Sequence, residues 1–154
     1  MGASIIRSGV ANCGRQVTTE RLRVLIVEDE AITALGLELT VRSLGYEVCG
    51  IVASGEDAVA AAGDHRPDLV LMDVRLSGEM DGIAAAAAIR REYGIPSLLV
   101  TAFSDPQTYE RARECRSVGL LAKPYTASQV ERTLADVAAG LGQGEPAQAR
   151  SRMA

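Results

Sequence analysis

Short apolar runs alternate with helical patterns along most of the chain. Runs rich in Val, Leu and Ile predict five strands, at residues 23–27, 47–53, 69–72, 97–101 and 118–122. Helical spacing or helix start signals fill the intervals and predict five helices, at residues 30–44, 54–65, 82–93, 105–116 and 126–140. In the first helix, Ile32, Leu35 and Leu39 recur at i, i+3 and i+7. This alternation predicts an α/β fold with a parallel sheet covered by helices on both faces.

Several polar residues mark where the helices begin. Ser54 is followed three residues later by Asp57, and Thr126 by Gln129, which is the spacing of a capping box. Asp105–Pro106 pairs an N-cap residue with proline at the first helical position. These signals are local, so they predict helix boundaries independently of the tertiary fold.

The two ends of the chain lack any such period. Residues 1–20 show neither helical nor strand spacing, and the sequence after Gly140 is composed mainly of Gly, Gln, Ala, Pro and Arg. The chain has 154 residues, about the length of one domain. We therefore expect a flexible N-terminal arm at 1–20, one domain at 21–140 and a flexible tail at 141–154.

Charge and composition exclude several function classes. The formal charge of −4 disfavours binding to nucleic acid or to an anionic membrane. Aromatic residues make up 3% of the chain, too few for a platform that stacks single-stranded bases. The longest apolar run, residues 82–89, is too short to span a bilayer. The three cysteines, Cys13, Cys49 and Cys115, lack metal-ligand spacing and favour a reducing, cytoplasmic location.

Charged and hydroxyl residues follow four of the predicted strands. Glu28-Asp29-Glu30 ends the first strand, Asp73 the third, Thr101 the fourth and Lys123 the fifth. In an open parallel sheet these ends meet at one edge, where ligands bind. Two carboxylates about 4 Å apart repel by roughly 4 kcal/mol at an effective dielectric constant of about 20. A hard divalent cation such as Mg²⁺, or Mn²⁺ in its place, would offset this repulsion.

The motifs at this edge resemble the receiver domain of two-component response regulators, over about residues 22–140. They are Val-Leu-Ile-Val-Glu-Asp-Glu at 24–30, Pro-Asp-Leu-Val-Leu-Met-Asp at 67–73, Met-Asp-Gly at 80–82, Val-Thr-Ala at 100–102 and Lys-Pro at 123–124. The resemblance implies a flavodoxin-like, doubly wound sheet of five strands in the order 2-1-3-4-5. It also implies a cis peptide bond at Lys123–Pro124.

The resemblance also implies a role for each residue at the edge. Asp73 would accept a phosphoryl group from a phosphohistidine of a sensor histidine kinase or a histidine phosphotransfer protein. Lys123 would pair with the phosphoryl oxygens, and Thr101 would donate a hydrogen bond to one of them. A carboxylate is a competent acceptor of a phosphoryl group. Beyond promoting its own phosphorylation and dephosphorylation, such a protein is not an enzyme.

The same resemblance supplies a set of ligands for Mg²⁺. Asp29 and Asp73 would bind the ion directly, and Glu28 would hold it through water. The backbone carbonyl of Arg75 would complete the set of protein ligands.

Three positions depart from the usual receiver pattern. The loop after Asp73 is one residue longer and contains Ser77, Gly78 and Glu79. Leu120 stands where receivers usually carry Tyr or Phe, and Phe103 lies two residues after Thr101. Without an aromatic ring at 120 to flip, the output signal would leave by rearrangement of the segment after Thr101. The expected output surface is residues 106–140, which is also the surface for a homodimer.

We therefore expect a single-domain response regulator that signals to a downstream protein by contact. Only about 14 residues follow the last predicted helix, too few for a helix-turn-helix module. Two alternatives stay open. The chain could be a receiver fragment of a larger hybrid kinase or regulator, or a scaffold module that is not phosphorylated.

Overall fold

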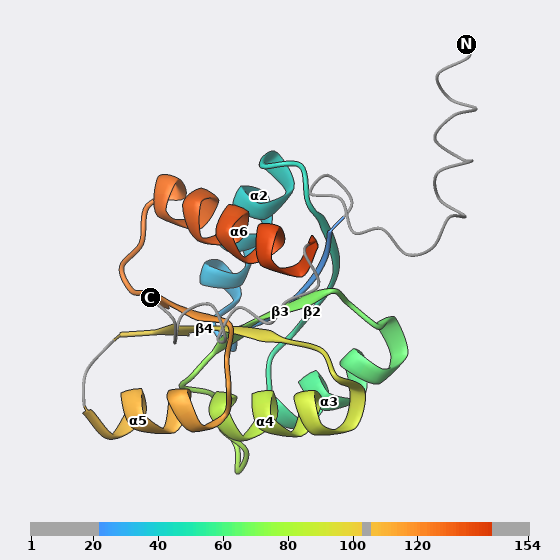
Figure 1. Ribbon diagram of the computed structural model, residues 1–154, viewed down its shortest axis with the longest axis vertical. Coiled ribbons are helices and arrows are strands. Elements are labelled where there is room, and N and C mark those ends of the chain that lie inside the picture. The colour runs from blue at the N-terminus through green and yellow to red at the C-terminus, as the bar shows by residue number, and fades with distance from the viewer. Residues whose placement is uncertain (1–21, 103–105, 143–154) are drawn as a thin grey trace.

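A single parallel sheet forms the centre of the molecule. The computed structural model describes residues 22–102 and 106–142. Within these, the strands pair in the order β2-β1-β3-β4-β5, which confirms the expected topology (Figure 1). The strands are β1 (Arg23–Val27), β2 (Glu47–Val52), β3 (Leu69–Asp73), β4 (Ser97–Thr101) and β5 (Gly119–Ala122).

Helices cover both faces of this sheet (Figure 1). The helices within the described residues are α2 (Ala31–Ser43), α3 (Gly55–His65), α4 (Gly82–Tyr93), α5 (Pro106–Glu114) and α6 (Ala127–Gly142). Helices α2 and α6 pack on one face, and α3, α4 and α5 pack on the other. Across the described residues, no helix is both long enough and apolar enough to cross a bilayer.

Each central strand contributes side chains to two separate cores. In β1, Val24 and Ile26 face the core under α2 and α6, whereas Leu25 and Val27 face the core over α3 and α4. This alternation follows from the two-residue period of a strand. Because both faces are covered, the interior positions of β1, β3 and β4 are apolar, which explains the continuous apolar runs in the sequence.

The predicted capping residues make the expected hydrogen bonds. The Ser54 hydroxyl accepts from the backbone N–H of Asp57 at 3.0 Å. The Thr126 hydroxyl accepts from the N–H of Gln129 at 3.2 Å, and the Gln129 side chain accepts from the N–H of Thr126 at 2.8 Å. The predicted cap Asp105 lies outside the described residues. Helix α6 runs to Gly142, two residues beyond the expected end.

Helix α2 forms where predicted, but the apolar residues that predicted it are exposed. The side chains of Ile32, Leu35 and Leu39 are 85%, 54% and 60% exposed. The face that packs on the sheet consists of Ala34, Leu37 and Val41. Helix α2 therefore carries one apolar face toward the core and another toward solvent.

The register of the strands brings the residues at their carboxyl ends to one level. Val27 pairs with Met72, so Glu28 follows β1 where Asp73 ends β3. Thr101, the last residue of β4, pairs with Ala122, and Lys123 follows directly. The sheet thus delivers these side chains to a common edge, as the sequence predicts.

Candidate functional site

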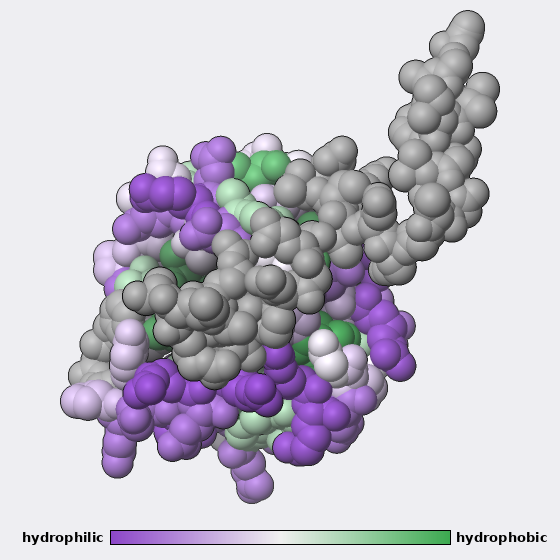
Figure 2. All heavy atoms as spheres, in the orientation of Figure 1, coloured by the Kyte–Doolittle hydropathy of each residue, from purple (hydrophilic) through white to green (hydrophobic). Residues whose placement is uncertain are grey.

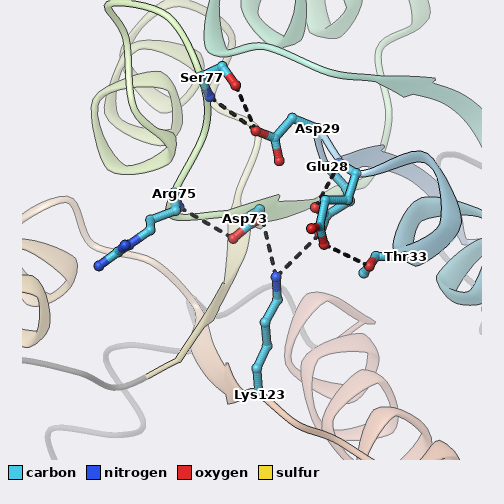
Figure 3. Close-up of polar contacts among 8 residues, drawn as sticks. Glu28, Asp29, Thr33, Asp73, Arg75, Ser77 and Lys123 are labelled. Carbon is cyan, nitrogen blue, oxygen red and sulfur yellow. Dashed lines mark hydrogen bonds and ion pairs between the residues drawn. The ribbon is translucent and has the colours of Figure 1, made fainter.

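Three carboxylates converge at the carboxyl edge of the sheet. One oxygen each from Glu28, Asp29 and Asp73 can be chosen so that all lie within 4.8 Å of one another. Glu28 and Asp73 are buried, each with 5% of its surface exposed, whereas Asp29 lies at the rim. Figure 3 shows Glu28 and Asp29 extending from the end of β1 beside Asp73 at the end of β3.

Lys123 reaches into this cluster from the end of β5 (Figure 3). Its Nζ donates to Asp73 Oδ2 at 3.2 Å and to Glu28 Oε1 at 3.4 Å. The Lys123–Pro124 peptide bond is cis, as the resemblance implies. Lys123 thus pairs with two of the three carboxylates, so the cluster has more acidic groups than basic ones.

The surroundings shift the pKa values of two of these groups. Burial raises the pKa of Glu28, and the nearby charge of Asp73 adds to the rise, although the backbone N–H of Glu30 and the charge of Lys123 oppose it. Burial alone would lower the pKa of Lys123, but the charges of Asp73 and Glu28 outweigh it and raise the pKa. Lys123 therefore stays charged at neutral pH, while Glu28 resists ionisation.

Asp73 lies in a cavity of about 300 Å³ that opens at the sheet edge. The backbone N–H of Arg75 donates to Asp73 Oδ1 at 3.3 Å, and the Arg75 side chain points away from the carboxylates (Figure 3). Thr101 is buried and lines the cavity with the small, exposed Ala102. The full lining is Asp73, Val74, Arg75, Leu76, Asp81, Thr101, Ala102, Thr108, Arg111 and Lys123.

Ser77 holds Asp29 in a way that the sequence did not reveal. Its backbone N–H and its hydroxyl both donate to Asp29 Oδ2, at 3.2 and 2.9 Å (Figure 3). The sequence showed that Ser77 belongs to a lengthened loop, but not where the loop folds. Since 48 positions separate the two residues, no local pattern could have indicated this contact.

A second unforeseen contact connects α4 to α5. Arg111 Nη1 and Nη2 donate to the two carboxylate oxygens of Asp81, at 2.8 and 3.2 Å. Asp81 is also the N-cap of α4, because its Oδ1 accepts from the N–H of Ala84 at 2.9 Å. Burial alone would raise the pKa of Asp81, but these hydrogen bonds and the Arg111 charge outweigh it, so the pKa is lowered.

The structure thus brings together Glu28, Asp29, Asp73 and Lys123, with Thr101 in the same cavity. Leu120 is partly buried against the core over α3 and α4. Phe103 lies outside the described residues.

The donor set of this site fits a hard divalent cation. Carboxylate oxygens are the ligands that Mg²⁺ prefers, and two of the three carboxylates are buried without a full complement of positive charge. Asp29 and Asp73 would bind the ion, Glu28 would hold it through water, and the carbonyl of Arg75 would complete the protein ligands. A bound ion would offset the mutual repulsion of these carboxylates.

These features define an open, doubly wound α/β domain with an acidic, lysine-flanked candidate cation site at the carboxyl edge of its sheet. The response regulator receiver domain family matches residues 24–135, and the chain belongs to this family.

Curated relatives and solved structures agree with this assignment. Transcriptional regulatory protein PdtaR of Mycobacterium tuberculosis is 42% identical over 108 residues, covering 70% of this chain and 52% of that protein. The signal receiver domain of a modulated diguanylate cyclase from Desulfovibrio desulfuricans G20 is 37% identical, with a TM-score of 0.72, over 79% of this chain and 95% of that one.

A third similar protein is the receiver domain of a sensor histidine kinase from Pseudomonas aeruginosa PAO1. It is 32% identical, with a TM-score of 0.69, over 77% of this chain and 98% of that one. Its crystal structure holds a magnesium ion coordinated in the active-site cleft. The present chain spans about half the length of the curated relatives that it matches.

Proposed function

We propose that this protein is a response regulator that accepts a phosphoryl group on Asp73 and signals by protein contact. The observation that carries the proposal is the position of Asp73. It lies buried at the edge of the sheet, bonded to Lys123 at 3.2 Å and next to two further carboxylates, at the wall of an open cavity. The phosphoryl donor would be a phosphohistidine of a sensor histidine kinase or histidine phosphotransfer protein.

The proposed transfer uses these side chains. An Asp73 carboxylate oxygen attacks phosphorus, the new O–P bond forms as the donor's N–P bond breaks, and the imidazole leaves and takes up a proton. Lys123, already held between Asp73 and Glu28, neutralises charge on the transferred oxygens. The Thr101 hydroxyl, in the same cavity, donates a hydrogen bond to one of them.

The phosphodonor protein would lie against the exposed face of α2. Ile32, Leu35 and Leu39 form an apolar stripe there, and α2 begins immediately after the acidic residues of the site. A helix with apolar side chains, packed on this stripe, would bring its phosphohistidine to the rim of the cavity. We propose that the output surface and a homodimer interface both lie at residues 106–140. The protein is proposed to work in the cytoplasm and to have no enzymatic activity beyond its own phosphorylation and dephosphorylation.

The test is phosphorylation by a small phosphodonor, followed by intact mass measurement. We expect the chain to gain one phosphoryl group in the presence of Mg²⁺ or Mn²⁺ and to gain none with excess chelator. Asp73→Asn should abolish the gain, whereas replacing the exposed Asp64 with Asn should leave it unchanged. An Asp73→Asn protein that still gains the group would overturn the assignment.

The same experiment tests one of the two alternatives, and a second measurement tests the other. A chain that gains no phosphoryl group under any of these conditions would favour a scaffold module that is not phosphorylated. A receiver that belongs to a larger hybrid kinase or regulator would also be phosphorylated on Asp73, but it would be one domain of a longer polypeptide. The size of the native gene product, compared with these 154 residues, tests that case.

A further inference from the structure

The phosphorylation cavity contains a guanidinium group that the proposed mechanism does not use. Arg111, on α5, lines the same cavity of about 300 Å³ as Asp73 and Lys123. In this structure it is paired through both terminal nitrogens with Asp81, at 2.8 and 3.2 Å. A planar guanidinium that can form two parallel hydrogen bonds suits a phosphoryl group as well as a carboxylate.

Helix α5 buries little apolar surface. Of its nine residues, Ala112 alone is buried. Hydrophilic side chains dominate the visible surface along α5 (Figure 2). Since one small side chain contributes little apolar burial, the Arg111–Asp81 pair is one of the contacts that fix where α5 lies against the start of α4. A change of partner for Arg111 would therefore be transmitted to the whole helix.

Asp81 can release Arg111 without becoming an isolated charge. Its Oδ1 caps α4 by accepting the N–H of Ala84, and the positive end of the α4 dipole lies against it. The ion pair itself is partly exposed, with 47% of the Arg111 side chain and 36% of the Asp81 side chain accessible to solvent. Pairs of this kind are weak, so a stronger anion nearby can compete for the arginine.

Phosphorylation supplies such an anion. A phosphoryl group brings up to about two negative charges and three acceptor oxygens, where Asp73 carried one charge. Lys123 is already shared between Asp73 and Glu28, and the proposed Mg²⁺ would also balance the charges of Glu28 and Asp29, so part of the added charge is left for another cation. Two further cations line the cavity, Arg75 and Arg111. The Arg75 side chain points away from the carboxylates (Figure 3), so Arg111 is the remaining candidate among the cations that line the cavity.

We propose that Arg111 is a phosphoryl-binding residue that exchanges its partner, from Asp81 in the unphosphorylated protein to the phosphoryl group on Asp73 in the phosphorylated one. The inference rests on the proposed function and extends it with a route by which phosphorylation moves α5. Such a route needs no aromatic ring at position 120, where this chain has Leu120.

The test uses beryllofluoride, a mimic of the phosphoryl group, titrated with Mg²⁺ and followed through backbone amide chemical shifts. In the wild-type chain we expect shifts at residues 73–75 and at residues 106–114. Arg111→Ala should bind beryllofluoride roughly tenfold more weakly, since it lacks a charge-assisted bidentate contact. It should keep the shifts at residues 73–75 and lose those at residues 106–114.

Two more variants separate partner exchange from a merely structural role. Asp81→Asn keeps a side-chain oxygen to cap α4 but frees Arg111, so it should bind beryllofluoride about threefold more tightly or better. The double variant Asp81→Asn/Arg111→Ala should bind as weakly as Arg111→Ala. If Arg111→Ala fails to fold, Arg111→Lys, with a single point charge, should still weaken binding and reduce the α5 shifts.

The matched control is Arg113→Ala. Arg113 lies on the same helix in an ion pair with Glu110 and does not line the cavity, so this variant should behave as the wild type. Wild-type affinity and wild-type α5 shifts in Arg111→Ala would overturn the exchange while leaving phosphorylation of Asp73 intact. The same holds if Arg75→Ala, and not Arg111→Ala, weakens binding. A wild-type chain that binds no beryllofluoride would remove the proposed function and the exchange together.

Discussion

At the residue scale, Gly82 shows how closely the site is packed beneath its charged groups. Its backbone N–H donates to the carbonyl of Val74 at 2.9 Å, so the start of α4 lies directly against the end of β3. A methyl group on Gly82 would overlap the carbonyl oxygen of Asp73 and would lie 2.9 Å from Cα of Val74. The glycine in Met-Asp-Gly is therefore required by this close approach of two backbones.

We expect Gly82→Ala to displace the backbone of Asp73. Overpacking against main chain that cannot move freely should reduce the free energy of unfolding by about 1–3 kcal/mol. It should also weaken beryllofluoride binding, since Asp73 and Arg75 would shift together. The measurements are urea unfolding and a beryllofluoride titration.

Gly36 provides the control for this substitution. It lies in the interior of α2, and a methyl group there would meet nothing within 4 Å. Gly36→Ala should leave beryllofluoride binding unchanged and raise the free energy of unfolding by up to about 1 kcal/mol, through helix propensity. Equal effects of the two substitutions would show that backbone packing under Asp73 is not what Gly82 provides.

The raised pKa of Glu28 predicts that both the stability of the protein and its affinity for Mg²⁺ depend on pH. The folded protein binds the proton of the Glu28 carboxyl more tightly than the unfolded chain does. Protonation of Glu28 therefore contributes to the free energy of unfolding, and this contribution is complete below the usual glutamate pKa of 4.5. That contribution is lost as pH rises through the raised pKa. If Glu28 helps to hold Mg²⁺ as proposed, the ion needs the ionised carboxylate, so its affinity should fall as pH drops through the same range, by up to about tenfold per pH unit.

Titration of Mg²⁺ by calorimetry at several pH values tests this linkage. Glu28→Gln should bind Mg²⁺ more weakly at neutral pH and with a flatter pH dependence, since one linked proton is removed. The same slope in both proteins would show that Glu28 does not take part in the linkage.

At the scale of elements, leucine-to-alanine substitutions on the two apolar faces of helix α2 distinguish the buried face from the exposed one. Leu37 is 4% exposed and packs against the sheet, whereas Leu39, two residues on, is 60% exposed. Leu37→Ala should reduce the free energy of unfolding by about 2–4 kcal/mol through the cavity that it leaves. Leu39→Ala should change it by no more than about 0.5 kcal/mol. Thermal or urea unfolding measures both, and a large cost at Leu39 would mean that the stripe is not free for a partner.

The same helix shows what sequence patterns can and cannot predict about elements. The spacing of Ile32, Leu35 and Leu39 predicted a helix at the right place, because helical periodicity is local. It could not tell that Ala34, Leu37 and Val41 form the buried face, since two apolar stripes share the helix. The strands at residues 23–27 and 97–101 matched residue for residue, because the run of large apolar residues in each strand, covered on both faces of the sheet, is bounded by polar ones.

At the scale of the whole molecule, the site residues fall into two groups by how they reach the site. Glu28, Asp73 and Lys123 sit at strand ends, and a parallel sheet always collects strand ends at one edge. Their convergence could therefore be predicted from the sequence. Ser77 and Arg111 arrive from a loop and from a helix face, so their contacts depend on how segments 48 and 30 positions apart pack together. No pattern along the chain encodes those contacts.

The acidic cluster also affects the stability of the entire fold. Lys123 pairs with Glu28 and Asp73, whereas Asp29 accepts its hydrogen bonds from the neutral backbone and hydroxyl of Ser77. Asp29 therefore repels the other two carboxylates with less compensation. Neutralising it should relieve this repulsion in the absence of a divalent cation and remove a ligand when the cation is present.

We expect Asp29→Asn to raise the free energy of unfolding by about 0.5–1 kcal/mol in chelator, a modest gain because Asp29 is exposed and solvent screens its charge. Added Mg²⁺ should stabilise the wild type by about 2.7 kcal/mol at a hundred times the dissociation constant, and the variant much less. Asp136→Asn, at an exposed position of α6, should match the wild type in both conditions. Thermal unfolding with chelator and with Mg²⁺ measures all three proteins. A variant that is less stable than the wild type in chelator, or that Mg²⁺ stabilises to the same extent, would contradict the electrostatic account of the site.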